Sequence, residues 1–250
     1  MCLIIFHRGD TRLDDDRLYE AHMTNPDGFG IMFPFRGHRE LFVFRGVHDF
    51  TVIRGFYNIA MQQNPDMVAL HFRTASSGPI DPMLCHPFSL GEVSFMHNGN
   101  FPEFQGHRWF NDIQWFSHDV LQRLPEGFLM DGEVRDDLET YCRLSHSKML
   151  FMDAERVYIV NEGAGEWIDG AWYSNGGIDN YLGYGYSGAY YYRAGDVRHP
   201  GGFPTPHLFG AKRRARWRRC AGCGGHFKKL ATVGHCRNCS ALVELRRHCI

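Results

Sequence analysis

A cysteine stands at position 2 of the chain, directly behind the initiator methionine and at the head of the apolar run Leu3-Ile4-Ile5-Phe6. If Met1 is removed, Cys2 carries a thiol and a free α-amino group, which are a nucleophile and a base within one residue. An α-amino group titrates near pH ~8, close to the pKa of a thiol. Because a cysteine here can also be the plain start of a buried strand, the rest of the chain must decide between the two interpretations.

Arg73 is the second candidate for site chemistry. It ends the apolar stretch 69–72 and is followed by Thr74 and by small hydroxyl and glycine residues. An arginine that leaves a buried strand can bind a carboxylate through two parallel hydrogen bonds. The alternative is a surface arginine paired with any nearby acid, which contributes little.

Two further stretches carry polar groups at element ends. Asn98 and Gly99 can direct a side-chain amide and a backbone N–H at one point, as an oxyanion hole requires, although Asn-Gly is also a common hairpin turn. Asp112 opens a predicted helix, where a carboxylate complements the helix dipole or receives an ammonium group.

The order of these stretches resembles the class II glutamine amidotransferase domain, a member of the N-terminal nucleophile hydrolase superfamily. The resemblance rests on Cys2, on the strand-end sequences HFRT (71–74) and HNGN (97–100), and on the acid at the next helix start. It extends to residues 25–30, 85–88, 166–167 and 172–175, and so covers about residues 2–175. The architecture looks like the compact stand-alone type of bacteria and their phages.

The resemblance implies a role for three residues in catalysis. Cys2 would attack the side-chain amide of glutamine, with its own α-amino group carrying the proton to the departing ammonia. Asn98 and Gly99 would bind the oxyanion of the tetrahedral intermediate. Water would then release glutamate from the thioester.

The resemblance also implies how the substrate binds. Arg73 would bind the α-carboxylate of glutamine and Asp112 its α-ammonium, with Thr74 and His97 next to them. The family usually has Ser-Asp-Thr where this chain has Asn-Asp-Ile at 111–113, so Asp119 is the alternative to Asp112. His97, like His71, can equally be a core histidine.

The C-terminal part contains two Cys-x-x-Cys pairs separated by twelve residues, Cys220 with Cys223 and Cys236 with Cys239. Four thiolates at this spacing can close a tetrahedral zinc site. A redox function would fit one such pair, not two. We therefore predict a structural zinc ion in a small ribbon whose fold needs the metal.

A basic stretch precedes these cysteines. It can bind phosphate groups while its tryptophan stacks on a base, or it can be a solvated linker or a surface for an acidic partner, the acidic domain of its own chain included. The candidate contact residues are Lys212, Arg213, Arg214, Arg216, Trp217, Arg218 and Arg219.

Composition bounds the class of protein. Of the 250 residues, 44% are hydrophobic and 22% charged, which is typical of a globular chain, and no run approaches the ~18 apolar residues of a membrane helix. We expect a cytoplasmic protein, of a bacterium or a phage-infected cell, without membrane contact and with reduced cysteines. The net charge of −1 is uneven, because residues 211–250 contain eleven Lys or Arg and one acid.

The elements that must position the candidate residues follow from hydrophobic spacing. Strands are predicted at 2–8, 29–35, 40–45, 66–73, 93–97, 148–153, 156–161 and 171–174, and helices near 51–63, 111–124 and 134–144, with 12–19 as a helix or a loop. Strands come in groups, which favours an α+β fold. The family resemblance specifies it as a four-layer αββα sandwich.

Three parts are predicted along the chain: the amidotransferase domain at 2–175, a Gly-, Tyr- and Pro-rich wrap or linker at 176–210, and a basic zinc ribbon with four cysteine ligands at 211–250. Because only 75 residues follow residue 175, ammonia is expected to pass to a separate acceptor enzyme. The acceptor reaction could belong to nucleotide or DNA-base modification. The alternatives are an amidohydrolase of γ-glutamyl compounds and a catalytically silent regulator that binds nucleic acid or protein.

Overall fold

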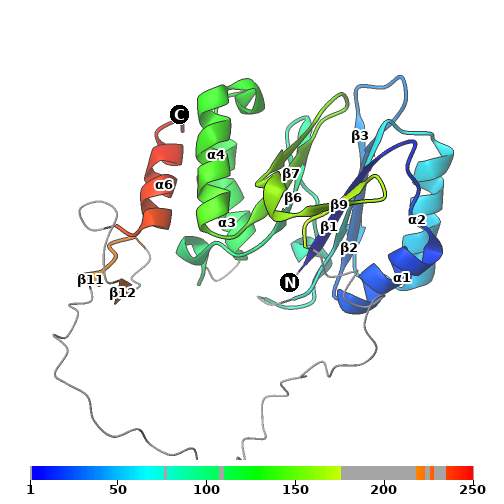
Figure 1. Cartoon of the computed structure of the whole chain (residues 1–250), viewed down its shortest axis with the longest axis horizontal. Helices are drawn as coiled ribbons and strands as arrows, with labels where there is room; N and C mark the ends of the chain where they lie inside the picture. Colours follow the sequence, from blue (N-terminus) through cyan, green and yellow to red (C-terminus); the bar gives the residue numbers. More distant parts are fainter. Residues whose placement is uncertain are drawn as a thin grey trace, which may run out of the picture.

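The chain forms a mixed α/β fold with two large antiparallel sheets (Figure 1). The structure is a computed structural model, and it describes residues 2–75, 78–106, 110–175, 218–222, 226–227 and 235–249. The predicted α+β class is therefore confirmed at the level of antiparallel sheets and helices. The predicted linker 176–210 lies outside the described residues.

The first sheet has six strands in the order β3-β2-β4-β1-β10-β9. Strand β1, which follows Cys2, lies inside this sheet and pairs antiparallel with β4 and β10. The sheet therefore surrounds the first residues of the chain with ordered backbone. Its strands are β1 (Leu3–Arg8), β2 (Phe29–Pro34), β3 (Leu41–Gly46), β4 (Met67–Phe72), β9 (Glu166–Ile168) and β10 (Ala171–Tyr173).

The second sheet has four strands in the order β5-β6-β7-β8. Strand β6 carries the HNGN sequence at its end, and its pairing with β7 extends to Asn98 and Lys148. The strands are β5 (Phe88–Leu90), β6 (Val93–Asn98), β7 (Lys148–Met152) and β8 (Val157–Val160).

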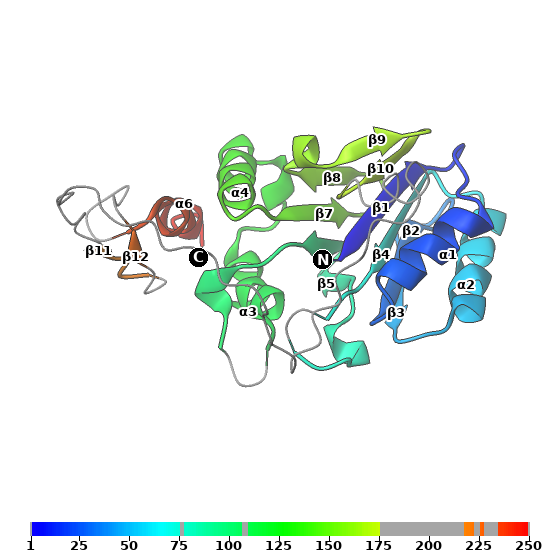
Figure 2. The ribbon, with the colours of Figure 1, turned by 60° about the horizontal axis from the view of Figure 1, so that its bottom comes forward.

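Helices cover the outer faces of the two sheets. The aspartates Asp14, Asp49 and Asp131 cap three of these helices by accepting hydrogen bonds from backbone N–H groups of the first turn. Helices α1 and α2 lie against the six-stranded sheet, and α3 and α4 lie beyond the four-stranded one (Figures 1 and 2). Their bounds are α1 (Asp15–Thr24), α2 (Phe50–Gln62), α3 (Asp112–Asp119) and α4 (Gly132–Leu144).

Alternating side chains divide the interior into layers. Leu3 and Ile5 of β1 pack with α1 and α2, whereas Ile4 and Phe6 face the second sheet. The layer between the sheets is apolar and combines residues of both: Ile4, Phe6, Met32, Met67, Ala69 and Trp172 with Met96, Leu150 and Met152. A third cluster joins the second sheet to α3 and α4.

The C-terminal part contributes a short strand pair, β11 (Arg218–Arg219) with β12 (His226–Phe227), and helix α6 (Arg237–Arg246). Helix α6 lies beside α4 (Figures 1 and 2). Its residues Ala241, Leu242 and Leu245 are buried in the cluster formed by α3 and α4. Sequence spacing did not predict this helix or its packing.

Most predicted elements are present within one or two residues of their expected bounds, and 15–24 forms a helix rather than a loop. The helix predicted at 111–124 is wrong in length. It ends at Asp119 because Val120 leaves the helical region, at φ −124° and ψ −66°, and a 3₁₀ turn at Leu121–Arg123 follows. Strands β5 and β9 are only three residues long and were not predicted.

None of the helices in the described ranges combines the length and the apolar character needed to cross a bilayer.

Truncation of a side chain between the sheets tests this architecture. Leu150 is fully buried there, so Leu150→Ala should lower the free energy of unfolding in urea by about 2–5 kcal/mol. Ile59 on α2 is 47% exposed, and Ile59→Ala should change the same quantity by less than about 0.5 kcal/mol. Equal effects of the two substitutions would contradict the assignment of this layer.

Candidate functional site

Strand alternation brings three candidate residues and Ser174 to one face. Ile4, Ala69, Met96 and Trp172 all point into the layer between the sheets. Residues an even number of positions away on the same strands share that face. At the strand ends, the residues with this even spacing are Cys2, Arg73, Asn98 and Ser174. They therefore meet at one edge of the layer between the sheets.

Cys2 is half-buried at this edge. Its Sγ contacts the backbone oxygen of Thr74 at 3.6 Å, and its own carbonyl accepts a hydrogen bond from Asn175 Nδ2 at 3.1 Å. Burial raises the pKa of the Cys2 thiol, and the contact with Thr74 and the charge of Arg73 only partly offset this effect. The thiol is therefore protonated at neutral pH and must lose its proton to a base if it attacks a carbonyl.

Arg73 and Thr74 follow β4 and are fixed by the turn at residues 25–28. The Arg73 N–H donates to Gly28 O at 2.8 Å, and its carbonyl accepts from the Asp27 N–H at 2.9 Å. Thr74 Oγ1 donates to Asn25 Oδ1 at 2.8 Å. The Arg73 guanidinium is buried and donates to Pro79 O at 3.0 Å. The turn therefore determines where this cation stands beside Cys2.

Asn98 and Gly99 end β6 and do not form a hairpin, because the next strand to pair with β6 along the chain is β7. Gly99 has φ +149°, and a Cβ there would lie 2.2 Å from Ser147 Oγ. A side chain at position 99 is thus excluded by both backbone conformation and space. The hairpin interpretation of this Asn-Gly pair is wrong.

Ser174 connects the two sheets at the site. Its Oγ accepts a hydrogen bond from the Ile4 N–H at 2.9 Å and from Asn98 Nδ2 at 2.8 Å, and its N–H donates to Ile4 O at 2.9 Å. The Asn98 amide is therefore held against the strand that carries Cys2. Sequence reasoning included residue 174 in the family resemblance but gave it no role.

Asp112 is buried at the first turn of α3. Its Oδ2 accepts a hydrogen bond from the Phe101 N–H at 2.8 Å, and Asn111 with Gln114 forms a capping box around it. Burial raises the pKa of the Asp112 carboxyl, more than its backbone hydrogen bonds lower it. Its charge also acts on the Cys2 thiol, which places the two groups in one electrostatic environment.

Asp119 stands at the opposite end of α3 and pairs with Arg123 at 3.8 Å and with Arg246 of α6. Seven residues of helix separate it from Asp112, about 10 Å along the axis. It therefore faces the C-terminal helix rather than the edge where Cys2 lies.

Three buried histidines lie behind these residues. The rings of His71 and His86 are 4.3 Å apart, and His97 stacks on Phe101 at 4.4 Å. Burial lowers the pKa of His71 and of His97 to about 3, so both rings are neutral at pH 7. His71 Nε2 lies 3.2 Å from the carbonyl oxygen of His97, which ties β4 to the end of β6. The burial of the His97 ring and its stacking on Phe101 support the core interpretation of His97.

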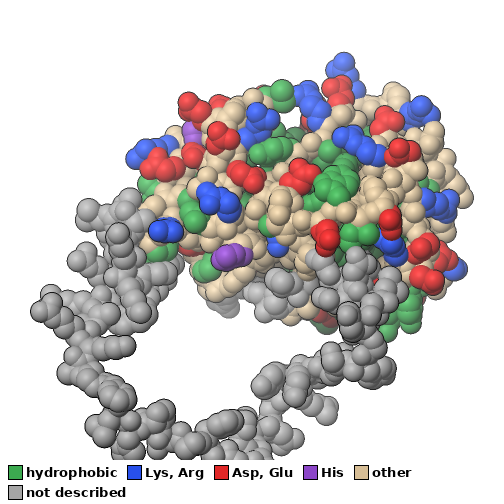
Figure 3. Space-filling view, in the orientation of Figure 1, with side chains coloured by type: hydrophobic (Ala, Val, Ile, Leu, Met, Phe, Trp, Pro, Cys, Tyr) green, Lys and Arg blue, Asp and Glu red, His purple; other side chains and the backbone are tan. Residues whose placement is uncertain are grey.

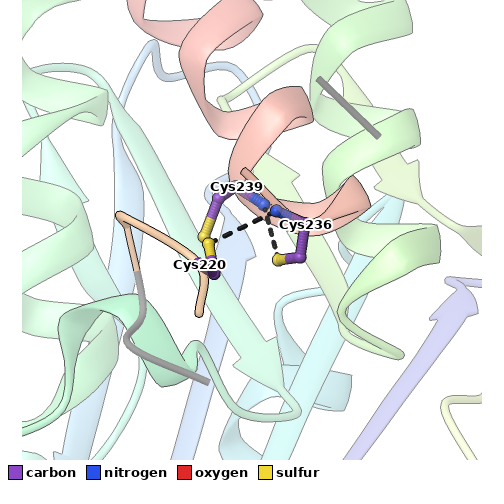
Figure 4. A group of neighbouring side chains, drawn as sticks. All are labelled: Cys220, Cys236 and Cys239. Carbon is purple, nitrogen blue, oxygen red and sulfur yellow. Dashed lines mark hydrogen bonds between the residues drawn. The ribbon is translucent and has the colours of Figure 1, made fainter. Parts of the chain in front are cut away.

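Three of the four described cysteines of the C-terminal part converge (Figure 4). Cys220, Cys236 and Cys239 are buried, and their sulfur atoms all lie within 4.8 Å of one another, so they could bind a metal ion. The N–H groups of Cys236 and Cys239 point at sulfur atoms, at 3.3 Å and 3.5 Å. Cys223, the predicted fourth ligand, lies outside the described residues.

The basic stretch that was predicted to contact nucleic acid or a partner also lies largely outside the described residues, which include only Arg218 and Arg219 of it. On the face shown in Figure 3, cationic and anionic side chains are interspersed over the described part of the molecule.

The chain has partial similarity to known proteins. No protein-family model matches the chain. The chain is 30% identical over 108 residues to a protein named probable glutamine amidotransferase DUG3 of Saccharomyces cerevisiae, a match that covers 41% of this chain and 29% of that protein. The match thus spans less than a third of the relative's length.

Solved structures with some similarity include a glutamine aminotransferase class-II domain protein from Silicibacter pomeroyi, at TM-score 0.38 and 16% identity over 69% of this chain and 87% of that one. Another is the glutamine phosphoribosylpyrophosphate amidotransferase from B. subtilis complexed with ADP and GMP, at TM-score 0.40 and 16% identity over 69% and 41%. Similarity this low does not transfer the role of any residue.

The burial of Asp112 makes a prediction for stability. Its pKa is raised in the folded state, so the folded protein binds this proton more tightly than the unfolded chain. Stability is therefore lost as the pH rises from the unfolded pKa to the folded pKa, and the full loss remains at higher pH. Asp112→Asn should therefore raise the melting temperature at pH 7, and the gain should disappear as the pH falls below ~4.

Asp119→Asn is the matched control on the same helix. It removes a partly exposed carboxylate that has arginine partners, so it should leave the melting temperature at pH 7 unchanged or slightly lower. A lower melting temperature for Asp112→Asn at pH 7 would contradict the assignment.

Proposed function

We propose that this chain hydrolyses the side-chain amide of glutamine and uses Cys2 as its nucleophile. One observation carries the proposal: the Cys2 thiol lies against Thr74 beside the buried Arg73, and Ser174 connects its strand to the amide of Asn98. The groups that would act as nucleophile, as cation for a carboxylate and as oxyanion donor thus lie at one edge of the layer between the sheets. The similarity to a probable glutamine amidotransferase supports the same class of reaction.

The chemistry requires that Met1 is removed. The α-amino group of Cys2 then accepts the thiol proton as sulfur attacks the amide carbon, which offsets the unfavourable thiol pKa. Asn98 Nδ2 and the Gly99 N–H stabilise the oxyanion that forms. Collapse breaks the C–N bond, and the proton passes from the α-amino group to the departing ammonia. Water then hydrolyses the thioester to give glutamate and the free thiol.

Two charged groups would orient the substrate. The Arg73 guanidinium would bind the α-carboxylate of glutamine, and the Asp112 carboxylate would bind the α-ammonium, with Thr74 and His97 adjoining the site. An ammonium at Asp112 would compensate the unfavourable burial of that carboxylate. We also propose that the layers described above are the αββα sandwich of N-terminal nucleophile hydrolases.

The proposal has two further parts. We assign a zinc ion to Cys220, Cys236 and Cys239, with Cys223 as the fourth ligand, because three buried sulfurs already converge and thiolates suit zinc. We also infer that the ammonia serves an acceptor reaction on a separate enzyme, for which amination of a nucleotide or a DNA base is one hypothesis.

The first test is intact mass and glutamate release measured on the same purified sample. The wild type should lack Met1 and release glutamate, whereas Cys2→Ala should fall to background because its nucleophile is gone. Cys142→Ala is the matched control, because Cys142 is a buried cysteine on α4, and it should retain activity. Glutamate release by Cys2→Ala would contradict the proposal. So would a wild-type protein that lacks Met1 and cleaves other γ-glutamyl compounds but not glutamine.

Ser174→Ala tests the positioning of Asn98. The substitution removes the acceptor of Asn98 Nδ2, so kcat should fall about tenfold or more while KM changes little, given that complete loss of an oxyanion donor costs ~100-fold. Ser94→Ala removes a buried hydroxyl whose side-chain hydrogen bond, among the described residues, is to Ser89 Oγ, and kcat should persist. If both variants lose kcat equally, Ser174 has no specific positioning role.

A further inference from the structure

Glu103 lies between the candidate site and the cysteine cluster. It belongs to the 3₁₀ turn η2 (Pro102–Phe104), five residues after Asn98. Its Oε2 accepts a hydrogen bond from Tyr141 OH of α4 at 3.1 Å, and its Oε1 contacts Cys239 Sγ at 3.4 Å and accepts from Asn238 Nδ2. One carboxylate thus contacts α4 and the first turn of α6.

The cysteine cluster forms the N-terminal end of α6. Cys236 caps this helix by accepting from the Cys239 N–H, and Cys220 approaches from the end of β11 (Figure 4). Tetrahedral zinc, with Zn–S bonds of ~2.3 Å, separates its sulfur ligands by roughly 3.8 Å. The sulfurs here all lie within 4.8 Å of one another, a range that includes this separation.

The rest of α6 is fixed by packing on the domain. Leu242 and Leu245 are buried against α3 and α4, and Arg246 pairs with Asp119 while its guanidinium lies 5.4 Å from the ring centre of Phe104. His248 Nε2 lies 2.9 Å from Asp137 Oδ2 on α4. These contacts run along the whole helix, from the cysteines to its C-terminal end.

Neither the helix nor the cluster is stable by itself. A helix of ten residues is marginal in water, and three buried thiols make no apolar core of useful size. Metal binding supplies folding free energy in such segments, and packing on α3 and α4 supplies the remainder. Metal binding and the packing of α6 on α3 and α4 therefore depend on each other.

We propose that the metal centre at Cys220, Cys236 and Cys239 is a latch that fixes α6 on α3 and α4. Glu103, which accepts a hydrogen bond from Asn238 Nδ2, joins the first turn of α6 to the segment carrying Asn98 and Gly99. The cysteines thus belong to the fold of the amidotransferase-like domain rather than to a module that moves independently. This proposal rests on the metal assignment above and not on the glutaminase assignment.

Coupling of this kind is reciprocal. If metal binding favours docking of α6 by some factor, docking favours metal binding by the same factor. An independent module would show no such relation. The two cases therefore differ in how a substitution at the helix interface changes metal affinity.

The first experiment measures zinc content and thermal unfolding of the full chain before and after chelation. One zinc ion per chain is expected, and its removal should lower the midpoint of the main transition by roughly 8–16 °C, for free metal ~1,000-fold above its dissociation constant. Hydrogen exchange should become faster at 98–106 and in α4. Absence of metal would overturn both the assignment and the latch, whereas bound metal with an unchanged midpoint would overturn the latch alone.

A matched pair of substitutions on α6 provides the second experiment. Leu245→Asp places a charge in the buried interface without changing a ligand, and it should weaken zinc affinity at least about tenfold. Val243→Asp makes the same change at a position that is 41% exposed, and both affinity and midpoint should persist. Equal zinc affinity in the two variants would overturn the latch. None of these readouts depends on glutamine hydrolysis.

Discussion

The hydroxyl of Ser174 accepts hydrogen bonds from both sheets, and the geometry of the candidate site depends on it. The apolar layer between the sheets holds them together, but apolar contact is non-directional and does not determine how their edges align. The bonds to the Ile4 N–H and to Asn98 Nδ2 are directional, and they fix one strand end against the other. The contact of His71 with the carbonyl of His97 adds a second such constraint nearby. Nucleophilic attack needs alignment to within a fraction of an ångström. Polar groups at the edge of the otherwise apolar layer between the sheets provide this alignment.

Burial at this layer also disfavours the charged forms of the site's ionisable groups in the free protein. Burial raises the pKa of both the Cys2 thiol and the Asp112 carboxyl, and it keeps His71 and His97 neutral. A low-dielectric site strengthens every electrostatic interaction with a bound charge, while it disfavours a charge that has no partner. Under the proposed function, the α-ammonium of the substrate would reduce this cost at Asp112, because it would compensate the buried carboxylate. The residues that would recognise the substrate therefore lower the free energy of unfolding of the free protein.

Much of the fold could be predicted from the sequence, because its long strands and helices have strong hydrophobic periods. The exceptions are short or depend on distant partners. Strands β5 and β9 have three residues each, too few for a period to be visible, and α3 ends at Asp119 for reasons of local backbone geometry. At the site, residue types at strand ends pointed to Cys2, Arg73 and Asn98 as candidates, and the structure brings these three residues to one edge. Ser174 could not be assigned a role, since its two partners lie 170 and 76 residues away in the sequence.

Helix α6 contacts acidic side chains of the rest of the chain. Most of the basic stretch before it, 211–217, lies outside the described residues, so its predicted contacts stay predictions. Arg246 pairs with Asp119, His248 lies against Asp137, and Asn238 with Cys239 contacts Glu103. Asp119 thereby acquires a structural partner, which leaves the first turn of α3 as the place where a carboxylate can face the site. The contact that docks the C-terminal helix thus gives Asp119 a structural role. Asp112 is the acid of α3 that the proposed function assigns to the substrate.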